Sequence, residues 1–482
     1  MNSRDNQRVK LVEDHKEKTA QHFDRRAEIY GQNVFKFNFY RKKLVEHLRF
    51  LVPSGASILE LGCGSGEILN ALSPSRGLGI DLSEKMVERA SAEFPHLEFR
   101  VGDAETFDEE ETFDCILMLG LIDHIYDVQS TFSILRKVCN RHTRVIILNL
   151  NFTWQPIFRF LESIGVREKK MDLNWLPLDD VENLLTLNGL ESIKKDYHLL
   201  LPFYFPLLSS LANRFLANTP LIWRLCVDQI VVARLQADQV QVEDYSCSVI
   251  VPARNEFGNI EKIVKRIPDM GLGTEIVFVE GGSQDATLAE CYRVKDAYPE
   301  KNIKVFIQDG IGKGDAVRKG FAMAEGDIFM ILDADISVDP EELPKFYSAL
   351  AEGRGEFING TRLVYQMEDQ AMRTLNLFGN YFFSRAFSYI LEQKLRDTLC
   401  GTKVLFKRDY ERIAEGRGYF GDFDPFGDFD LLFGAAKLNL KIVEIPIRYR
   451  ARAYGSTNIK RFAHGWLLIK MVIFSLRKIK FL

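Results

Sequence analysis

Residues 58–66 read ILELGCGSG, a short apolar run that ends in three closely spaced glycines. The apolar part is typical of a buried β-strand, and Gly62, Gly64 and Gly66 permit a tight turn and a close approach of a ligand to the backbone. A dinucleotide-binding loop of the G-x-G-x-x-G type would need glycine at position 67, where this chain has Glu67. The spacing therefore favours a different cofactor.

The acidic residues around this loop favour a cationic ligand. Glu60 lies in the run that leads into the loop, and a carboxylate is a poor neighbour for pyrophosphate but a good one for the cationic amino acid moiety of S-adenosylmethionine. Asp81, followed by Leu82, ends the next apolar run, where its carboxylate can accept hydrogen bonds from ribose hydroxyls. Asp103, followed by Ala104, ends the third run and can meet an adenine amino group in the same cleft.

Short apolar runs alternate with helical patterns throughout the first half: SILEL, GLGIDL, LEFRVGD, FDCILML and RVIILNL. This alternation predicts a parallel sheet covered by helices. The order ELGCGSG, GIDLS, VGDAE, FDCILMLGLIDHI resembles class I S-adenosylmethionine-dependent methyltransferases. The resemblance is strong over residues 20–150 and looser to residue 235, where DQIVVARL is similar to the closing antiparallel strand of that family. It implies a Rossmann-like sheet that binds S-adenosyl-L-methionine through the glycines and acidic residues named above.

Methyl transfer is an in-line displacement, so the enzyme mainly aligns the nucleophile and excludes water, with a base added for a hydroxyl acceptor. His124, in LIDHI, is the nearest candidate base, and a structural role for this histidine stays open. Residues 151–211 are rich in aromatic side chains and are expected to shape the acceptor pocket, without naming the acceptor. Within them, the apolar stretch 199–211 is too short to span a membrane and is expected to be core.

A second series of apolar runs begins with CSVIVPARN and continues with EIVFVEGG, KVFIQD and DIFMILDAD. Asp333 and Asp335 end the last run, and alternation in an extended chain places both on one side. Paired carboxylates at a strand end suit Mg²⁺ or Mn²⁺ bridging a diphosphate. Lys313, in the glycine-flanked segment GIGKGDAV, can neutralise phosphate charge at the same place.

PARNE, EGGSQDAT, GKGDAV and DAD in this order resemble family 2 glycosyltransferases, which have the GT-A fold. The resemblance covers residues 246–459, and DTLCGTK, DFDLL and IPIRYRARAYGST are similar to the dolichyl-phosphate mannose synthase branch and to other transferases that use a polyprenyl phosphate. It implies a nucleotide sugar as donor and a divalent metal. The resemblance places Pro252, Glu256 and Glu280 at the border of the nucleotide and Arg452 facing phosphate. It also places Asp335 at the metal, with Asp333 near it.

The resemblance also places Asp397 and Asp430 near the transferred sugar. Either could assist a sugar hydroxyl as a base, whereas a lipid phosphate acceptor is already anionic at neutral pH and needs none. Two positions depart from the family pattern: Glu280 is followed by glycine where adjacent aspartates are usual, and Ser337 replaces a glutamine. The Q-x-x-R-W motif of processive synthases is absent, which favours transfer of a single sugar.

The composition agrees with two soluble α/β domains. The chain has 482 residues, 46% of them hydrophobic and 27% charged, with a net charge of -4, so a nucleic-acid partner is not expected. The cysteines form no C-x-x-C pair and the first residues lack a signal sequence, which favours the cytoplasm. The expected division is a methyltransferase at 1–235, a linker at 236–245, a glycosyltransferase at 246–459 and an amphipathic helix at 460–482.

Two hydrophobic segments near the end of the chain bear on membrane contact. Residues 378–391 are apolar but interrupted by polar side chains, so they are expected to be core. Residues 466–482 are apolar with basic residues gathered at their end, which is the composition of a helix lying in an anionic interface. An ordinary terminal helix packed on its domain is the alternative.

Together these patterns predict a bifunctional enzyme that methylates one group and transfers one sugar in cell-surface glycan or glycolipid synthesis. The rival hypothesis keeps the glycosyltransferase active and treats the first half as a non-catalytic binding or scaffolding module. A third possibility is two unrelated activities joined for co-expression or membrane recruitment.

Overall fold

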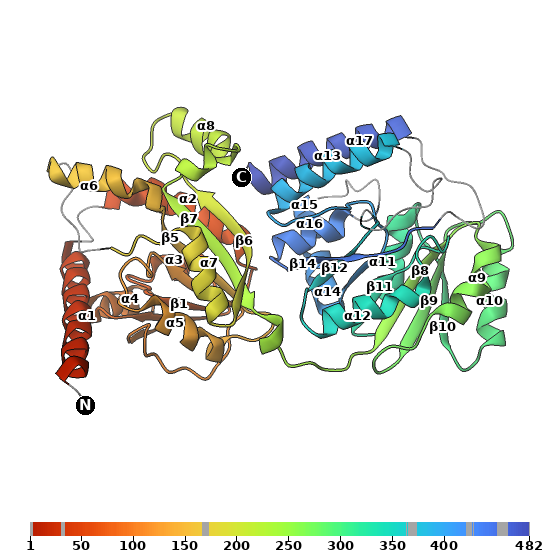
Figure 1. Ribbon diagram of the computed structural model, residues 1–482, viewed down its shortest axis with the longest axis horizontal. Helices are drawn as coiled ribbons and strands as arrows, with labels where there is room; N and C mark the ends of the chain where they lie inside the picture. Colours follow the sequence, from red (N-terminus) through yellow and green to blue (C-terminus); the bar gives the residue numbers. More distant parts are fainter. Residues whose placement is uncertain are drawn as a thin grey trace. The chain divides into compact units, whose positions relative to one another are not determined.

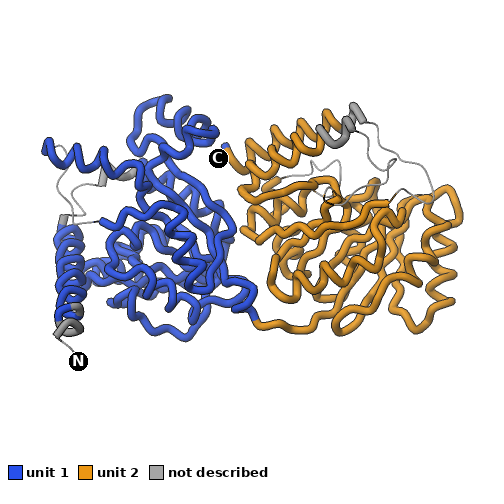
Figure 2. Tube along the Cα trace, in the orientation of Figure 1, with its two compact units in different colours: residues 1–240, 481–482 blue, residues 241–480 orange. Residues whose placement is uncertain are grey.

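A computed structural model of the chain describes residues 3–29, 34–165, 173–362, 364, 374–420, 427, 429–450 and 461–481. The chain forms two compact units, residues 1–240 with 481–482 and residues 241–480 (Figure 2). Each unit is built on its own seven-stranded sheet (Figure 1).

The sheet of the first unit has the strand order β3-β2-β1-β4-β5-β7-β6. Strand β7 pairs antiparallel with both of its neighbours, and the other pairs are parallel. The carboxyl ends of β1 to β6 and the amino end of β7 therefore meet at one edge, which we call the carboxyl edge. The strands are β1 (Ser57–Leu61), β2 (Arg76–Asp81), β3 (Glu98–Val101), β4 (Cys115–Leu119), β5 (Arg144–Leu150), β6 (Leu190–His198) and β7 (Asp228–Leu235).

Both faces of this sheet are covered, because alternate residues of the central strands enter different hydrophobic clusters. Val145 and Ile147 of β5 belong to one cluster, and Ile146 and Leu148 to the other. The α-helices are α1 (Ser3–Ile29), α2 (Val34–Leu51), α3 (Glu67–Ala71), α4 (Glu84–Glu93), α5 (Val128–Leu135), α6 (Gln155–Ser163), α7 (Leu178–Leu187) and α8 (Leu208–Arg214). Short 3-10 turns lie at Arg136–Val138, Phe152–Trp154, Leu216–Asn218, Trp223–Leu225 and Ala237–Gln239.

The sheet of the second unit has the order β10-β9-β8-β11-β13-β12-β14, in which β13 runs antiparallel to both neighbours. Strands β8 and β11 lie side by side at its centre, so the segments after them leave from the same edge. The strands are β8 (Cys247–Ala253), β9 (Thr274–Glu280), β10 (Asn302–Ile307), β11 (Ile328–Ile331), β12 (Phe357–Thr361), β13 (Lys403–Phe406) and β14 (Ile442–Pro446).

Helices pack around this second sheet, and two of them, α13 and α17, lie against each other. The α-helices are α9 (Phe257–Arg266), α10 (Thr287–Ala297), α11 (Lys313–Met323), α12 (Leu343–Ala351), α13 (Thr374–Leu391), α14 (Lys407–Glu415), α15 (Arg417–Phe420), α16 (Phe429–Lys437) and α17 (Arg461–Ser475). A 3-10 turn lies at Pro340–Glu342, and a π-helical turn at Leu476–Lys480 follows α17. The fold class predicted from the sequence, two α/β domains, is confirmed.

The two apolar segments expected to be core are only partly so. Of residues 199–211, Leu199 is buried, whereas most side chains from Phe203 onward are exposed. In α13, Phe383 and Phe387 are buried while the neighbouring Tyr381 is exposed. Hydropathy alone could not separate these cases, because a buried helix and an exposed apolar surface have the same composition. Among the described residues, no helix is long and apolar enough to cross a membrane.

Candidate functional sites

The loop between β1 and α3 folds back on the end of β2. The amide of Gly62 donates to the carbonyl of Ile80 at 2.7 Å, and the amide of Gly64 donates to Asp81 Oδ2 at 2.8 Å. Gly62, Gly64 and Gly66 all have positive φ, a conformation that favours glycine. A Cβ atom on Gly66 would also lie 2.5 Å from Cζ of Phe99. The loop therefore needs glycine for both its turn and its packing.

Glu60 is a buried carboxylate directly behind this loop, with only 2% of its surface exposed. Its Oε2 atom has no hydrogen-bond partner among the described residues. Burial, and secondarily the charge of Asp81, raise the pKa of Glu60 to about 8. A carboxyl group in this state would gain from a cationic partner, because the partner would supply the missing charge compensation. The site thus fits the amino acid moiety of S-adenosyl-L-methionine.

Asp81 ends β2 with both carboxylate oxygens at the carboxyl edge. Oδ2 accepts from Gly64, and Oδ1 accepts from the amide of Ser83 at 2.9 Å. Burial raises the pKa of Asp81, and the hydrogen bonds from Ser83 and Gly64 oppose this shift. Each carboxylate oxygen can accept a further bond, so Asp81 and the adjoining Leu82 are placed as a ribose-binding strand end would be.

Asp103 and Ala104 follow β3 at the same edge, but the carboxylate of Asp103 already forms an ion pair with a lysine of α1. Lys16 Nζ of α1 is 2.7 Å from Asp103 Oδ2 and 3.1 Å from Glu105 Oε2. Further along α1, Asp24 Oδ1 accepts from the hydroxyl of Ser83 at 2.5 Å. Helix α1 therefore runs past the ends of β2 and β3, where the cofactor residues were predicted.

The sequence did not predict this placement of α1, because the helix is polar over most of its surface and shows no binding motif. Its contacts also reach His124, the predicted methyl-transfer base. His15 Nε2 donates to the carbonyl of His124 at 2.9 Å, and the Phe23 ring lies 5.2 Å from the His124 ring. His124 thus lies in a turn before α5, under α1, at the carboxyl edge.

A second group of titratable residues lies at the same edge and was not singled out from the sequence. Asp228, fully buried at the start of β7, has Oδ2 3.9 Å from Nδ1 of His198 at the end of β6. The His198 ring lies 4.8 Å from that of His47. Burial and then Asp228 raise the pKa of Tyr40 well above its ordinary value. A carboxylate beside an imidazole can orient that imidazole for proton transfer. Little in the sequence indicated this group, because its residues are far apart in the chain and share no motif.

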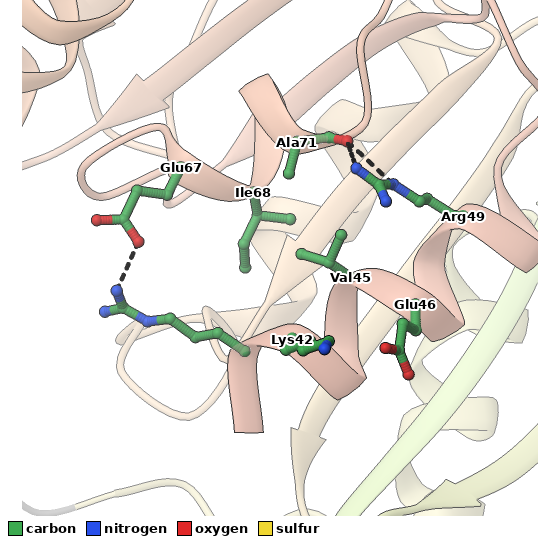
Figure 3. Close-up of a pocket in the computed structure, with 8 residues that line it drawn as sticks. Lys42, Val45, Glu46, Arg49, Glu67, Ile68 and Ala71 are labelled. Carbon is green, nitrogen blue, oxygen red and sulfur yellow. Dashed lines mark hydrogen bonds and ion pairs between the residues drawn. The ribbon is translucent and has the colours of Figure 1, made fainter. Parts of the chain in front are cut away.

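A surface pocket between α2 and α3 lies outside this group of residues (Figure 3). Arg41 reaches Glu67 Oε2 at 2.5 Å across one end of the pocket, and Arg49 donates to the carbonyl of Ala71 at the other. Neither Glu60 nor Asp81 lines the pocket. These contacts fasten α3, and with it the glycine loop, to α2.

In the second unit, two of the residues predicted at the phosphate and the metal, Lys313 and Asp333, come together after β11. Lys313, the first residue of α11, has Nζ 2.7 Å from Asp333 Oδ1. Gly401 closes over this pair, since a Cβ there would collide with Asp333 Oδ2 and lie 2.6 Å from Lys313 Nζ. The Lys313 ammonium group therefore neutralises the Asp333 carboxylate directly after β11.

Asp335, two residues after Asp333, is buried, and its Oδ1 accepts from the amide of Ser337 at 3.0 Å. Among the described residues, no group of three or more acidic, histidine or cysteine side chains could hold a metal. Mg²⁺ and Mn²⁺ sites at diphosphates commonly have one or two carboxylates and take their other ligands from phosphates and water, so Asp333 with Asp335 fits such an ion. Arg450 donates its amide to the carbonyl of Ser337 at 3.1 Å, and Arg452 lies outside the described residues.

The residues predicted to border the nucleotide differ in their surroundings. Pro252 lies at the end of β8. Glu280 Oε1 accepts from the amide of Ser283 at 2.5 Å. Glu256 is buried and accepts from Asn259 at 2.7 Å, so its carboxylate supports the start of α9. A Cβ on Gly281 would lie 3.3 Å from Oε1 of Gln308.

Asp397 is fully buried and paired with Arg362. The guanidinium donates to both carboxylate oxygens, at 2.7 and 2.8 Å, and the amides of Arg362 and Leu399 donate at 3.1 Å. Burial alone would raise the pKa of Asp397, but the bonds from Arg362 outweigh it and lower the pKa. A carboxylate held in this way is a poor base, so the geometry favours a positioning role for Asp397 over proton abstraction.

Asp430 is the better placed of the two predicted bases. It lies in the first turn of α16, and its Oδ2 accepts from Arg417 Nε at 3.2 Å. Gly427, shortly before it, packs backbone to backbone on Gly314, beside Lys313: a Cβ on Gly314 would lie 2.7 Å from Gly427 Cα. The segment before α16 is thereby held next to the start of α11, which carries Lys313.

Comparisons with known proteins agree with both units. A methyltransferase domain model matches residues 58–142, and the family model of glycosyl transferase family 2 matches residues 248–413. Dolichol-phosphate mannosyltransferase of Pyrococcus furiosus is 32% identical over 44% of this chain, and the match spans 59% of that relative's length.

One similar solved structure is that of glucosyl-3-phosphoglycerate synthase of Mycobacterium tuberculosis, in complex with Mn²⁺ and uridine diphosphate. It is 20% identical to this chain, and the TM-score is 0.36. The match covers 49% of this chain and 80% of that chain. A S-adenosylmethionine-dependent methyltransferase of Thermotoga maritima is 15% identical, with 45% and 99% covered and a TM-score of 0.36.

The two matched domains both belong to enzyme classes that transfer chemical groups. The first unit contains a methyltransferase domain, and the second contains a glycosyl transferase family 2 domain.

Proposed function

We propose that the chain is a bifunctional enzyme. The first unit transfers a methyl group from S-adenosyl-L-methionine, and the second transfers a single sugar from a nucleotide sugar to a polyprenyl phosphate or a glycan, in the synthesis of a cell-surface glycan or glycolipid. The observation that carries the proposal is that each unit has a cluster of charged residues at one edge of its sheet: Glu60 with Asp81 in the first, and Lys313 with Asp333 in the second, followed by Asp335.

In the first unit, Glu60 and Asp81 would hold the amino acid and ribose ends of the methyl donor, and α1 would keep water away from it. When bound, S-adenosyl-L-methionine supplies the electrophilic methyl group. A hydroxyl acceptor would need a base, and the two candidates are His124 under α1 and His198 beside Asp228. An acceptor that is already a competent nucleophile would need only alignment.

In the second unit, the donor diphosphate would bind between Lys313 and the metal carried by Asp333 and Asp335. The ion pair between Lys313 and Asp333 supports this, because a bound metal and diphosphate would offer each of them an opposite charge in place of the other. A sugar hydroxyl acceptor would lose its proton to Asp430, whereas a lipid phosphate would attack directly. Asp397 would hold Arg362 in place.

An acceptor at a membrane suits the helix pair α13 and α17. Tyr381 and Phe382 of α13 are exposed, as are Trp466 and Ile473 of α17. Lys470 of α17 is also exposed. Aromatic side chains with basic neighbours favour the interface of an anionic bilayer, so we propose peripheral membrane contact through this pair.

Binding and turnover separate this proposal from the rival in which the first unit is a scaffold. Calorimetry should detect S-adenosyl-L-methionine binding to the full chain and lose it in Asp81→Ala. Absence of heat in the unaltered chain would favour the scaffold. For the second unit, a screen of UDP-, GDP- and dTDP-sugars against polyprenyl phosphate and sugar acceptors should find one donor whose use requires Mg²⁺ or Mn²⁺.

A further inference from the structure

The first unit carries an exposed apolar surface at the same edge as its cofactor site. It comes from two segments, residues 152–164 after β5 and residues 203–225 between β6 and β7; we call it the apolar surface. Its most exposed side chains are Phe160, Phe203, Tyr204, Leu207 and Leu221. In Figure 1, α6 and α8, which belong to the two segments, project from the same side of this unit.

Hydrogen bonds join the two segments to each other, so the backbone that carries the surface is held in a defined position. Asn151, just before the first segment, donates through Nδ2 to the carbonyls of Arg224 and Cys226 at 2.8 and 2.7 Å. Trp154 donates through Nε1 to the carbonyl of Leu225 at 2.9 Å. These bonds fix the backbone while the apolar side chains face outward.

Two leucines are displayed at positions where the backbone is strained. The amide of Leu208 donates to the carbonyl of Pro206 at 2.7 Å, which closes a γ-turn on Leu207 with φ 62° and ψ -44°. This hand of γ-turn is rare and strained. Leu221 has φ 83°, which is unfavourable for a branched side chain. Leu207 is 80% exposed and Leu221 85% exposed, so among the described residues burial of these side chains does not compensate for the strain.

The charged side chains of the apolar surface indicate which kind of partner binds it. Residues 199–227 contain no aspartate or glutamate, and their charged residues are Arg214 and Arg224, both exposed. The other segment of the surface adds Arg159 and Glu162, so the apolar surface carries three arginines and one glutamate. Apolar side chains at loop tips, aromatic neighbours and a net positive charge suit the surface of an anionic bilayer, where leucines enter the acyl region and arginines meet headgroups. Single protruding leucines suit a fluid layer better than a rigid protein groove.

We propose that the apolar surface docks the methyltransferase unit on an anionic lipid bilayer, and that its methyl acceptor is a lipid-anchored molecule reached from that bilayer. The segment 199–227 begins directly after His198 and ends directly before Asp228, so docking would bring the carboxyl edge to the headgroups. The inference of a lipid-anchored acceptor rests on the methyl-transfer activity proposed above. The inference that the apolar surface docks on a bilayer does not depend on that activity.

A fluorescent label at the tip tests the docking in the full chain. All seven native cysteines are buried, so Leu221→Cys can be labelled selectively with the environment-sensitive dye NBD. With phosphatidylcholine vesicles that contain phosphatidylglycerol, the emission should rise severalfold and shift to the blue, and less so in high salt or without phosphatidylglycerol. Leu187→Cys is the matched control: Leu187 is 64% exposed at the end of α7, before β6 and so at the opposite edge, and should not respond.

No response at position 221 would overturn the proposal. This holds even if the chain binds the vesicles through α17, because the label would then report that the apolar surface stays in water. A response that appears without vesicles as protein concentration rises would overturn it in favour of a second copy of the chain. Neither readout needs a methyl or sugar donor, so failure of the proposed function would not be mistaken for failure of docking.

A second variant removes the two leucines whose backbone is strained. Glycine accepts positive φ, so Leu207→Gly with Leu221→Gly should leave the unfolding temperature unchanged or raise it. Each lost leucine is worth roughly a factor of ten in partition, so vesicle affinity should fall at least tenfold. Unchanged vesicle affinity, or a lowered unfolding temperature, would contradict the assignment of these leucines to the bilayer.

Discussion

Glu60 gives the most quantitative test of the methyl-donor site, because its protonation state should change when the donor binds. With a pKa of about 8, Glu60 is mostly protonated at pH 7 in the free protein. A cationic ligand beside it favours the carboxylate. Binding at pH 7 should therefore release about 0.9 proton, the fraction that is protonated beforehand.

The same shift predicts how stability depends on pH. A carboxyl group whose pKa is raised on folding binds a proton more tightly in the folded state, so its contribution is favourable below the ordinary pKa of 4.5 and is lost as pH rises toward 8. The free energy of unfolding of the first unit should fall by about 1.4 kcal/mol per pH unit in this window, roughly 5 kcal/mol in all. Bound S-adenosyl-L-methionine should offset much of the loss.

The perturbation is Glu60→Gln, which keeps the shape of the side chain and removes its titration. The variant should bind S-adenosyl-L-methionine about 10- to 100-fold more weakly, since a hydrogen bond to a charged group is worth about 1.5–3 kcal/mol. Calorimetry in phosphate and in Tris measures the released proton, because the observed heat includes the ionisation heat of the buffer. Equal heats in both buffers, or unaltered affinity in the variant, would refute the reasoning.

Three further substitutions test other parts of the account. Gly66→Ala should abolish binding of S-adenosyl-L-methionine in calorimetry, because the added Cβ lies 2.5 Å from Phe99 Cζ at a positive φ; retained affinity would show that the loop adapts. Arg362→Ala should lower the free energy of unfolding of the second unit by about 3–5 kcal/mol in denaturant titration, because it leaves the buried Asp397 unpaired; a change below about 1 kcal/mol would contradict this. Trp466→Ser should weaken flotation of the chain with anionic vesicles severalfold while donor turnover with a water-soluble acceptor stays unchanged; equal flotation would exclude α17 from the membrane contact.

The sequence predicted the fold class and the cofactor types because short motifs encode them directly. The glycines around Gly64 are needed for a particular backbone path, and alternating apolar runs report a buried parallel sheet. Asp333 and Lys313, distant in the sequence, were expected at one place, and the structure brings them to 2.7 Å. Their roles, like those of the other site residues, stay predictions.

What the sequence could not predict depends on contacts between distant segments without a motif. The salt bridge from Lys16 to Asp103 and the pairing of Arg362 with Asp397 involve ordinary charged residues, whose partners only the fold selects. The exposed Leu207 belongs to the stretch 199–211 that hydropathy assigns to a core, and Leu221 follows it in the same connection between β6 and β7. Hydropathy reports preference for an apolar environment, and a bilayer satisfies it as well as a protein interior does.

The central claim, two independent enzymes in one chain, is tested most directly by comparing two variants of the full chain in the same two assays. Asp81→Ala should lose S-adenosyl-L-methionine binding and keep metal-dependent turnover of the nucleotide sugar found in the donor screen. Asp335→Ala should keep the binding and lose the turnover by about two orders of magnitude or more. Loss of both properties in either variant, or metal-dependent turnover that survives Asp335→Ala, would contradict the account.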